Sequence, residues 1–361
     1  MPHTIYAARQ EKLAQALDQA GLNALALNPG PSLTYLTGLH FHLSERPVVA
    51  FFTPGKPVHI VLPLLERLKV ENSPFPIQAF TYAEDPSGWG KVFSDAASSG
   101  KLHGVMGIEP RQLRVLELRL VELAAPAVQF TSAENVVASL RMQKDDTELD
   151  SMLKAVQIAQ EALQNTLPHF RIRMSEKELA SELILQTLRA GSEGELPFMP
   201  IVSAGPNSAN PHATPTDRTI LPGDLLVIDW GAAFAGYFSD LTRTFAIGEV
   251  DPEYQKIAKI VLEANAAGRA AGKPGALAKE VDLAARGVIE AAGYGEYFTH
   301  RTGHGLGMES HEPPYMRNDN EQTLLPGMTY TVEPGIYLPG WGGIRIEDDV
   351  LVTRTGRAAG S

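Results

Sequence analysis

The chain contains no cysteine among its 361 residues. That absence excludes disulfide frameworks, thiolate nucleophiles and cysteine-ligated metal sites together. Basic residues are also in deficit, because 31 Lys and Arg stand against 42 Asp and Glu, a formal net charge of −11. A broad basic surface for nucleic acid is therefore not expected. Any metal in this protein has to be bound by His, Asp and Glu.

Long apolar runs are missing as well. No stretch of the sequence approaches the about 20 apolar residues that a membrane-spanning helix needs. The N-terminal MPHTIYAARQEKLAQALDQAG is charged and amphipathic, without the apolar region of a secretory signal. We therefore expect a soluble cytoplasmic protein with neither a membrane nor a nucleic acid as its partner. The length of the chain predicts about two domains.

The first part of the chain alternates helical and extended patterns. TIYAARQEKLAQALDQAG predicts an amphipathic helix that ends at Gly21. NALALN, GVMGIE and AVQF predict strands, PVVAFF and PVHIVLP predict a hairpin around a Pro/Gly turn, and RQLRVLELRLVELA predicts a helix. This alternation predicts an α/β domain over residues 1–130.

Charged, helical patterns follow. Residues 131–146 predict a helical linker, and a long helix is expected from about 146 to 167. Ser175 and Glu178 have the spacing of a capping box, which predicts that the next helix begins there.

After Gly191 the pattern changes to short strands separated by Gly/Pro turns. FMPIVSAG, LLVIDWG, YFSDLTRTFAIG, MTYTVEPGIYL and IRIEDDVLVT predict strands, and two helices are expected near 252–271 and 276–292. Residues 147–361 are thus predicted to form an α+β domain, a largely antiparallel sheet backed by helices.

Two aspartates flank a turn in LLVIDWGAAFAGYFSDLTRTF. If that turn centres near 234–236, Asp229 and Asp240 fall nearly opposite each other on paired strands, with Cβ atoms about 4.5–5.5 Å apart. Two bare carboxylates at that distance repel each other and raise one pKa, and a divalent cation removes the repulsion. The alternative is two solvated aspartates at strand ends.

Two glutamates repeat this theme in TYTVEPGIYLPGWGGIRIEDDVLVT. Glu333 ends an apolar strand, and Glu347 lies among apolar residues in IRIEDDV. By strand alternation Arg345 and Glu347 point to the same face. Charged side chains in so apolar a strand are unusual without a partner. A buried Arg–Glu ion pair is the alternative to a metal site.

A histidine completes the set in RTGHGLGMESHEPP, where three glycines crowd His304. Two Asp, two Glu and one His are the ligand count for two divalent metals that share bridging carboxylates and lie about 3.5–4 Å apart. Oxygen-rich ligation suits Mn²⁺, and the single imidazole also admits Co²⁺, Zn²⁺ or Fe²⁺.

IVSAGPNSANPH, VIDWGAAFAGYFSDLTRTF, RTGHGLGMESHEPP, TVEPGIYLPG and GGIRIEDDVLVT resemble the successive motifs of the pita-bread metallopeptidases. The resemblance is closer to the Xaa-Pro peptidase branch, the prolidases and aminopeptidases P, and it covers roughly residues 175–353. The preceding 130 residues fit the smaller N-terminal domain of that branch. The resemblance implies a creatinase/prolidase-like α/β domain, then a pita-bread α+β catalytic domain like those of creatinase and methionine aminopeptidase.

The resemblance implies a role for each metal ligand. Asp229 matches the bidentate ligand of one metal, and Asp240 and Glu347 match the bridging carboxylates. His304 and Glu333 match the ligands that complete the shell of the other metal. Two divalent ions per subunit are implied, with Mn²⁺ expected first and Co²⁺ or Zn²⁺ as alternatives.

Catalytic and substrate-binding roles are implied in the same way. His212 and His311 match the two histidines on the substrate side, and Arg345 matches the arginine that orients the site. We expect a metal-bridged hydroxide to attack the scissile carbonyl and Glu333 to pass a proton to the proline nitrogen. His300 is expected to be a structural or surface residue.

The implied activity is hydrolysis of the Xaa-Pro bond at the N-terminus of small proline-containing peptides, with dipeptides as the main substrates and a homodimer as the assembly. An aminopeptidase P acting on longer Xaa-Pro-Xaa peptides is the alternative. A peptide-binding module of the same fold without catalysis is the remote one, and the complete ligand set argues against it.

Two positions depart from the family pattern. Ser310 stands before His311 where the family usually has a β-branched aliphatic residue, and the second departure bears on the substrate. Where several dipeptide-specific relatives place an arginine that holds the terminal carboxylate of the substrate, this chain has Tyr315. Dipeptide selectivity still needs a cation, because a buried carboxylate without one is costly. Arg46, in GLHFHLSERPVV, is one candidate and Arg317 is a second. The alternative for Arg46 is a solvated pair with Glu45.

Overall fold

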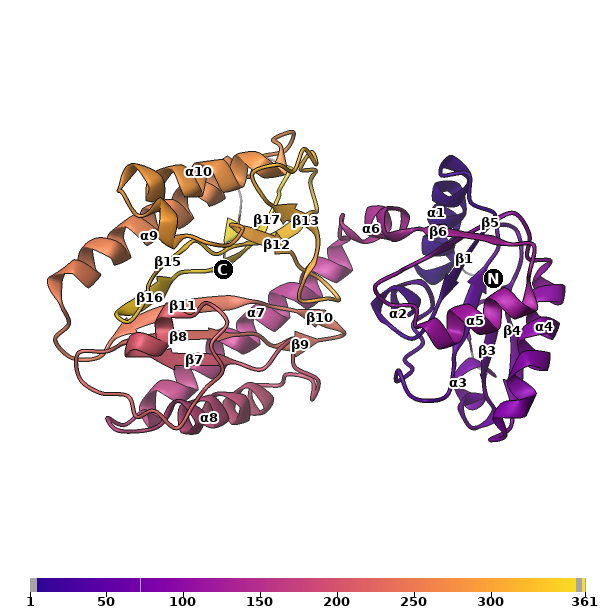
Figure 1. Ribbon diagram of the computed structural model, residues 1–361, viewed down its shortest axis with the longest axis horizontal. Coiled ribbons are helices and arrows are strands. Elements are labelled where there is room, and N and C mark those ends of the chain that lie inside the picture. The colour runs from indigo at the N-terminus through magenta and orange to yellow at the C-terminus, as the bar shows by residue number, and fades with distance from the viewer. Residues whose placement is uncertain (1–4, 72, 355–358, 361) are drawn as a thin grey trace. The chain divides into compact units, whose positions relative to one another are not determined.

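The structure is a computed structural model that describes residues 5–71, 73–354 and 359–360 (Figure 1). The chain divides into two compact units, Met1–Arg141 and Met142–Ser361. The division falls inside the stretch predicted as a linker, 131–146, and the helix α6 (Glu134–Arg141) belongs to the first unit. Among the described residues, no helix combines the length and apolar character needed to cross a bilayer.

The first unit contains a six-stranded mixed sheet in the order β4-β3-β2-β1-β5-β6. Its strands are β1 (Ala24–Leu27), β2 (Val49–Phe52), β3 (Val58–Pro63), β4 (Ile77–Tyr82), β5 (Val105–Ile108) and β6 (Gln129–Ser132). The other helices of this unit are α1 (Ile5–Gln19), α2 (Pro31–Thr37), α3 (Leu68–Glu71), α4 (Trp89–Gly100) and α5 (Val115–Ala124), with short 3₁₀ turns at Leu64–Glu66 and Pro86–Gly88. The predicted β2–β3 hairpin is confirmed as an antiparallel pair.

Four elements of this unit had not been predicted: β4, α4 and the two short helices α2 and α3. β4 is the edge strand of the sheet, and only one of its residues is fully buried. An edge strand faces solvent along one side, so its sequence lacks the continuous apolar run of the central strands. α4 contains seven Gly, Ala and Ser residues in WGKVFSDAASSG, which weakens a helical apolar pattern.

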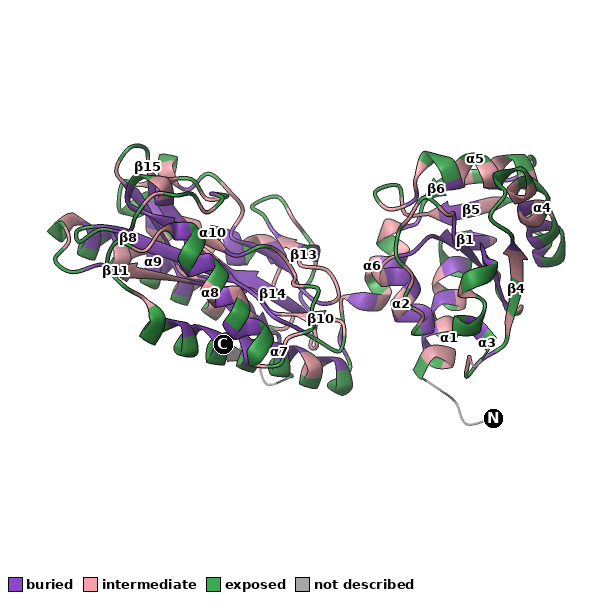
Figure 2. Cartoon of the chain, turned by 90° about the horizontal axis from the view of Figure 1, so that it is seen from below, coloured by how far each residue is buried: buried purple, intermediate pink, exposed green. Residues whose placement is uncertain are grey.

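The second unit places its strands between two pairs of helices (Figure 1). These are α7 (Asp146–Thr166) and α8 (Glu176–Arg189) on one side, and α9 (Pro252–Ala271) and α10 (Ala278–Ala291) on the other. The capping box at Ser175 and Glu178 is confirmed at the start of α8. Buried residues gather on the strands and on the inward faces of these helices (Figure 2).

The strands of this unit are antiparallel, as predicted. One sheet has the order β11-β8-β7, a second the order β13-β12-β14-β17-β18, and the pairs β9–β10 and β15–β16 stand beside them. The bounds are β7 (Ile201–Ala204), β8 (Leu225–Trp230), β9 (Ala233–Phe234), β10 (Tyr237–Phe238), β11 (Leu241–Ala246), β12 (Gly303–Gly305), β13 (Glu312–Met316), β14 (Thr329–Val332), β15 (Gly335–Leu338), β16 (Gly342–Arg345), β17 (Asp348–Leu351) and β18 (Ala359–Gly360). Short 3₁₀ turns lie at Leu167–His169, Gly205–Ala209 and Gly295–Tyr297.

Two runs predicted as single strands are each split where a glutamate stands. Glu333 lies between β14 and β15, and Glu347 lies between β16 and β17. β14 pairs with β17 and β15 pairs with β16 in registers that continue through the break, so the two glutamates stand opposite each other there. The Glu347 N–H donates to the Thr242 carbonyl at 3.1 Å, which ties this crossing to β11. At this break the Glu347 carboxylate reaches Thr242 of β11, and the Glu333 carboxylate reaches His304 of β12.

The aspartates of the β8–β11 hairpin differ from the prediction in register. The turn lies at Ala235 and Gly236, both with positive φ, as a two-residue hairpin turn requires. Asp229 is paired with Thr242, so Asp240 is its diagonal neighbour and not its direct partner. Asp240 still points to the same face, because a shift of two residues along a strand preserves the side.

Candidate metal centre and substrate cavity

The five predicted metal ligands line one cavity of about 630 Å³ in the second unit. The cavity is also lined by the three other residues predicted from the motifs, His212, His311 and Arg345. Its ligands come from β8, the β10–β11 connection, β12 and the two strand breaks.

Three groups of these side chains bring ligand atoms within 4.8 Å of one another. They are Asp229–Asp240–Glu347, His304–Glu333–Glu347 and Asp240–His304–His311. Glu347, Asp240 and His304 each belong to two groups, and of these the two carboxylates can bridge two metals through their paired oxygens. The third group adds His311, whose predicted role was on the substrate side.

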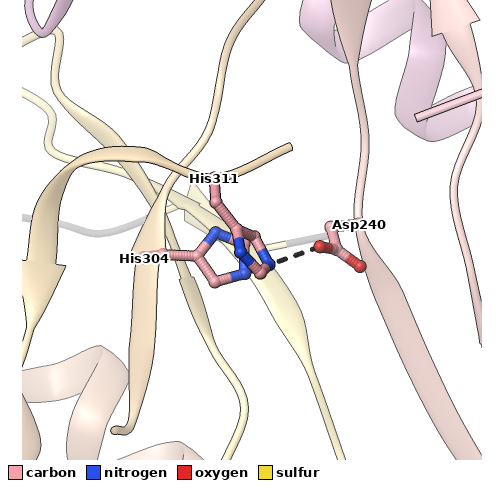
Figure 3. A group of neighbouring side chains, drawn as sticks. All are labelled: Asp240, His304 and His311. Carbon is pink, nitrogen blue, oxygen red and sulfur yellow. Dashed lines mark ion pairs between the residues drawn. The ribbon is translucent and has the colours of Figure 1, made fainter. Parts of the chain in front are cut away.

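His304 presents one ring nitrogen to the carboxylates. Its Nδ1 lies 3.1 Å from the Gly305 carbonyl. Because a carbonyl only accepts, Nδ1 holds the proton, and the lone pair of Nε2 is left to bind a cation. Nε2 lies 3.4 Å from Glu333 Oε1 and 3.6 Å from Asp240 Oδ2, separations suited to atoms that share a cation at about 2 Å. Figure 3 shows this imidazole beside that of His311, facing Asp240.

The carboxylates are difficult to ionise together without a cation. Burial is the main cause that raises the pKa of Asp240 and of Glu347 well above the ordinary value, and neighbouring carboxylates add to it. Burial also raises the pKa of Asp229, against the opposing charge of Arg345. The Oδ1 atom of Asp229 is buried and has no hydrogen-bond partner among the described residues. An oxygen-rich set with excess negative charge and an unused acceptor fits two divalent cations.

The pKa of Glu333 is raised less than those of Asp240 and Glu347. Burial raises its pKa to about 7, with Arg345 opposing that rise and Asp229 adding to it. A carboxyl group with a pKa near 7 can both take up and release a proton at neutral pH.

Arg345 connects several parts of the site. Its guanidinium donates to Asp229 Oδ2, to Thr242 Oγ1 at 3.1 Å and to the Pro211 carbonyl at 3.1 Å. The predicted alternative of an Arg345–Glu347 ion pair is wrong as to the partner, which is Asp229. Through Pro211 the same side chain holds the segment that leads into the predicted substrate residue, His212.

Thr242 fixes the orientation of the bridging glutamate. Its hydroxyl accepts from Arg345 Nε and donates to Glu347 Oε2 at 2.6 Å. A carboxylate that already accepts a hydrogen bond at one oxygen has a defined direction for the other.

A chain of hydrogen bonds that sequence patterns did not reveal continues from Arg345 to His300. Arg345 Nη1 donates to the Tyr337 hydroxyl at 3.0 Å, so that hydroxyl donates its own proton to His300 Nε2 at 2.9 Å. His300 Nδ1 therefore holds the ring proton and donates to the Arg301 carbonyl at 2.7 Å. Burial lowers the pKa of His300 to about 4, which keeps the ring neutral. His300 lines the cavity and positions Arg301.

The glycines around His304 allow two strands to approach closely. A Cβ atom at Gly303 would lie 1.8 Å from the Thr331 carbonyl oxygen, and one at Gly305 would lie 2.3 Å from the Pro313 carbonyl oxygen. Neither distance is compatible with a side chain. The glycines thus bring the ligand strand against its neighbours on both sides.

The two predicted substrate histidines are exposed to solvent through the cavity. The backbone N–H of His212 donates to Asn210 Oδ1 at 3.1 Å, and its ring makes no hydrogen bond to a described residue. The ring centroid of His311 lies 3.9 Å from that of His304. Both rings are placed to meet a ligand in the cavity.

The structure also shows the surroundings of two residues considered in connection with the terminal carboxylate of the substrate, Arg46 and Tyr315. Arg46 lies in the first unit and pairs with Glu45 at 2.6 Å and with Glu84 at 2.9 Å, so the predicted Glu45 pair is present. Tyr315 is not among the residues that line the cavity, but its ring lies beneath Arg301, with the guanidinium carbon 4.5 Å from the ring centroid.

Comparison with known proteins agrees with this geometry. Residues 150–354 match metallopeptidase family M24, and residues 9–143 match the Creatinase/Prolidase N-terminal domain. The chain belongs to metallopeptidase family M24, and its two units have the creatinase-type N-terminal and pita-bread catalytic folds.

Among its relatives is the Xaa-Pro dipeptidase of Lactobacillus delbrueckii subsp. lactis, 32% identical over 96% of this chain and 94% of the relative. Among solved structures, a dipeptidase from Pyrococcus horikoshii matches with a TM-score of 0.91 and 38% identity over 98% of this chain and 97% of the other. A recombinant prolidase from Thermococcus sibiricus matches with a TM-score of 0.92 and 32% identity over 99% and 97%.

Proposed function

We propose that this protein is an Xaa-Pro dipeptidase, a prolidase, that hydrolyses the bond before proline in short peptides. The main support is one cavity lined by two Asp, two Glu and one His that can hold two divalent cations, with His212 and His311 beside them. Relatives of nearly full length that are named dipeptidase, prolidase and Xaa-Pro dipeptidase support the substrate class. A cavity of about 630 Å³ has the size of a site for a small ligand.

Two divalent ions bound here would supply Lewis acidity and a nucleophile at neutral pH. The residues of the chain then orient the peptide and handle its protons. Glu333, which lines the cavity beside the other ligands, accepts a proton at its carboxylate and passes it to the proline nitrogen. That nitrogen belongs to a tertiary amide and leaves poorly without protonation. His212 and His311 face the cavity, where their ring N–H groups can donate to the oxygen on which charge develops.

The proposal also includes finer features that the family resemblance suggests. They are Mn²⁺ as the native metal, with Co²⁺ or Zn²⁺ as substitutes, a homodimer as the assembly, and a cytoplasmic location. The oxygen-rich donor set supports Mn²⁺, which prefers carboxylate ligands.

The decisive experiment for the substrate class compares kcat/KM for an Xaa-Pro dipeptide with that for the corresponding Xaa-Pro-Xaa tripeptide. A dipeptidase recognises the free carboxylate by a charge-assisted interaction of about 1.5–3 kcal/mol, so we expect at least a roughly tenfold preference for the dipeptide. A preference for the tripeptide would instead indicate an aminopeptidase P. No cleavage of either peptide by metal-loaded protein would reject both activities.

Arg46 remains a predicted contributor to carboxylate binding from the first unit. If it contacts that carboxylate, Arg46→Ala lowers kcat/KM for the dipeptide about tenfold or more and changes tripeptide cleavage little. Arg67→Ala is a matched control, because Arg67 belongs to the same unit and pairs on the surface with Glu71 at 2.8 Å. Equal effects of Arg46→Ala on the two substrates would remove it from this role.

A further inference from the structure

Three arginines line the cavity, and two of them already have a carboxylate partner. Arg345 pairs with Asp229. Arg317 pairs with Asp319 at 2.9 Å, and its side chain is 54% exposed. Arg301 makes no ion pair with any carboxylate in the described part of the chain. Within this unit, Arg301 is therefore the lining arginine whose charge is available to a ligand.

Separate contacts hold the guanidinium and the backbone of Arg301. One face lies against the Tyr315 ring, with the guanidinium carbon 4.5 Å from the centroid. Its backbone carbonyl accepts the proton of His300 Nδ1 at 2.7 Å, at the end of the hydrogen-bonded chain that starts at Arg345. Stacking on an aromatic ring leaves the N–H edge of a guanidinium for polar partners, and beside the contact of Nη2 with His311 Nδ1 at 3.5 Å the remaining N–H groups can meet a planar anion.

Arg301 also lies close enough to the predicted metal ligands to meet the terminal carboxylate of a dipeptide. Its Nη2 is 3.5 Å from Nδ1 of His311, and the ring of His311 lies 3.9 Å from that of the metal-ligand residue His304. In an Xaa-Pro dipeptide the terminal carboxylate is separated from the scissile carbonyl by only the proline nitrogen and Cα, less than one residue's length of about 3.8 Å. A cation that binds this carboxylate therefore has to lie close to the metal ligands. Arg301 meets this condition, because only the His311 ring lies between its guanidinium and the ligand His304.

We propose that Arg301 binds the C-terminal carboxylate of the dipeptide through the N–H edge of its guanidinium, with the Tyr315 ring as its platform. This inference rests on the proposed prolidase activity and names a residue that determines its specificity. Tyr315 occupies the position where several relatives carry an arginine. Here its ring orients Arg301, which stands three residues before His304 and supplies the positive charge. A longer peptide would offer Arg301 only a neutral carbonyl at this point, which is a weaker acceptor.

The test compares an Xaa-Pro dipeptide with its C-terminal amide, which differs only in the charge. Arg301→Gln is expected to lower kcat/KM for the dipeptide about 10- to 100-fold while changing that for the amide less than about threefold. Arg301→Lys keeps the charge but loses the planar fork, so its effect should be intermediate. Arg317→Gln tests the competing candidate in the cavity lining, and if Arg301 binds the carboxylate, this variant keeps the ratio of kcat/KM for the dipeptide to that for the amide near the value of the unmodified protein.

A binding measurement separates this inference from the proposed function. Titration calorimetry on metal-depleted protein should show that Arg301→Gln weakens binding of the dipeptide and leaves binding of the amide unchanged. Equal losses for dipeptide and amide would overturn the proposal and leave Arg301 as a positioning residue for His311. A selective loss in Arg317→Gln alone would transfer the role to Arg317. Failure of metal-loaded wild-type protein to cleave either peptide would reject the prolidase activity, whereas the calorimetric ratio would still decide the role of Arg301.

Discussion

Glu347→Gln is expected to lower kcat/KM for an Xaa-Pro dipeptide by more than about 100-fold. Loss of a residue that only hydrogen-bonds a metal ligand typically costs about 10- to 100-fold, and loss of a ligand should cost more. Glu347 belongs to two of the three ligand groups, so the substitution weakens both cation positions at once. Glutamine has the same shape and still accepts from Thr242, so the fold is kept. Metal content of the purified variant, measured by mass spectrometry, should fall together with activity.

The same variant gives an independent result in the metal-free state. Burial raises the pKa of Glu347 in the folded protein, so its ionisation at neutral pH costs stability that glutamine does not lose. Metal-free Glu347→Gln should therefore melt at or above the temperature of the metal-free parent at pH 8. Glu321→Gln, an exposed glutamate paired with Lys279, is the matched control and should change neither property. Unchanged metal content and activity in Glu347→Gln would contradict the assignment of this bridging ligand.

Removal of metal is expected to abolish Xaa-Pro hydrolysis, and addition of Mn²⁺, Co²⁺ or Zn²⁺ should restore it. The reason is that the carboxylates of the site are arranged to share cations, and bound cations would supply the nucleophile at neutral pH. The measurement is activity against residual metal content during exhaustive chelation. Full activity with metal content near zero would reject the mechanism.

The stabilisation of the protein by bound metal should also depend on pH and be larger at high pH, because the ligand carboxylates are then ionised. The pKa values of Asp240 and Glu347 are raised in the folded metal-free protein, so the stability they contribute is present below the unfolded pKa and is lost as pH rises through the folded pKa. Glu333, with its pKa raised to about 7, extends this loss to neutral pH. A cation reverses it, because it binds the ionised form and releases protons. The increase in melting temperature on adding Mn²⁺ should therefore be larger at pH 8 than at pH 5.

Much of the fold could be predicted because its signals are local. The capping box at Ser175, the helices over 252–271 and 278–291 and the hairpin turn near Gly236 each depend on a few neighbouring residues. The edge strand β4 lacked such a signal, since a half-exposed strand has no strong apolar pattern.

The arrangement of the site was predicted only in part. The residue types of the metal ligands and their positions at strand ends were visible in the sequence. The diagonal placement of Asp240 relative to Asp229, and the strand breaks at Glu333 and Glu347, depend on the pairing register of segments distant in the chain. A register depends on side chains of both strands and on the core beneath them, so one strand's sequence does not determine it.

The sequence by itself determined which donor atoms are available and in what order they occur, because the absence of cysteine and the five motifs restrict the chemistry to carboxylates and imidazoles. Only the tertiary structure decided which charges remain available for a ligand. Arg345 is paired with Asp229 and Arg317 with Asp319, while Arg301, stacked on Tyr315, lines the cavity without a carboxylate partner in the described part of the chain. The physical reason is that an ion pair forms between whichever opposite charges the folded backbone brings within a few ångströms, whatever their separation in sequence.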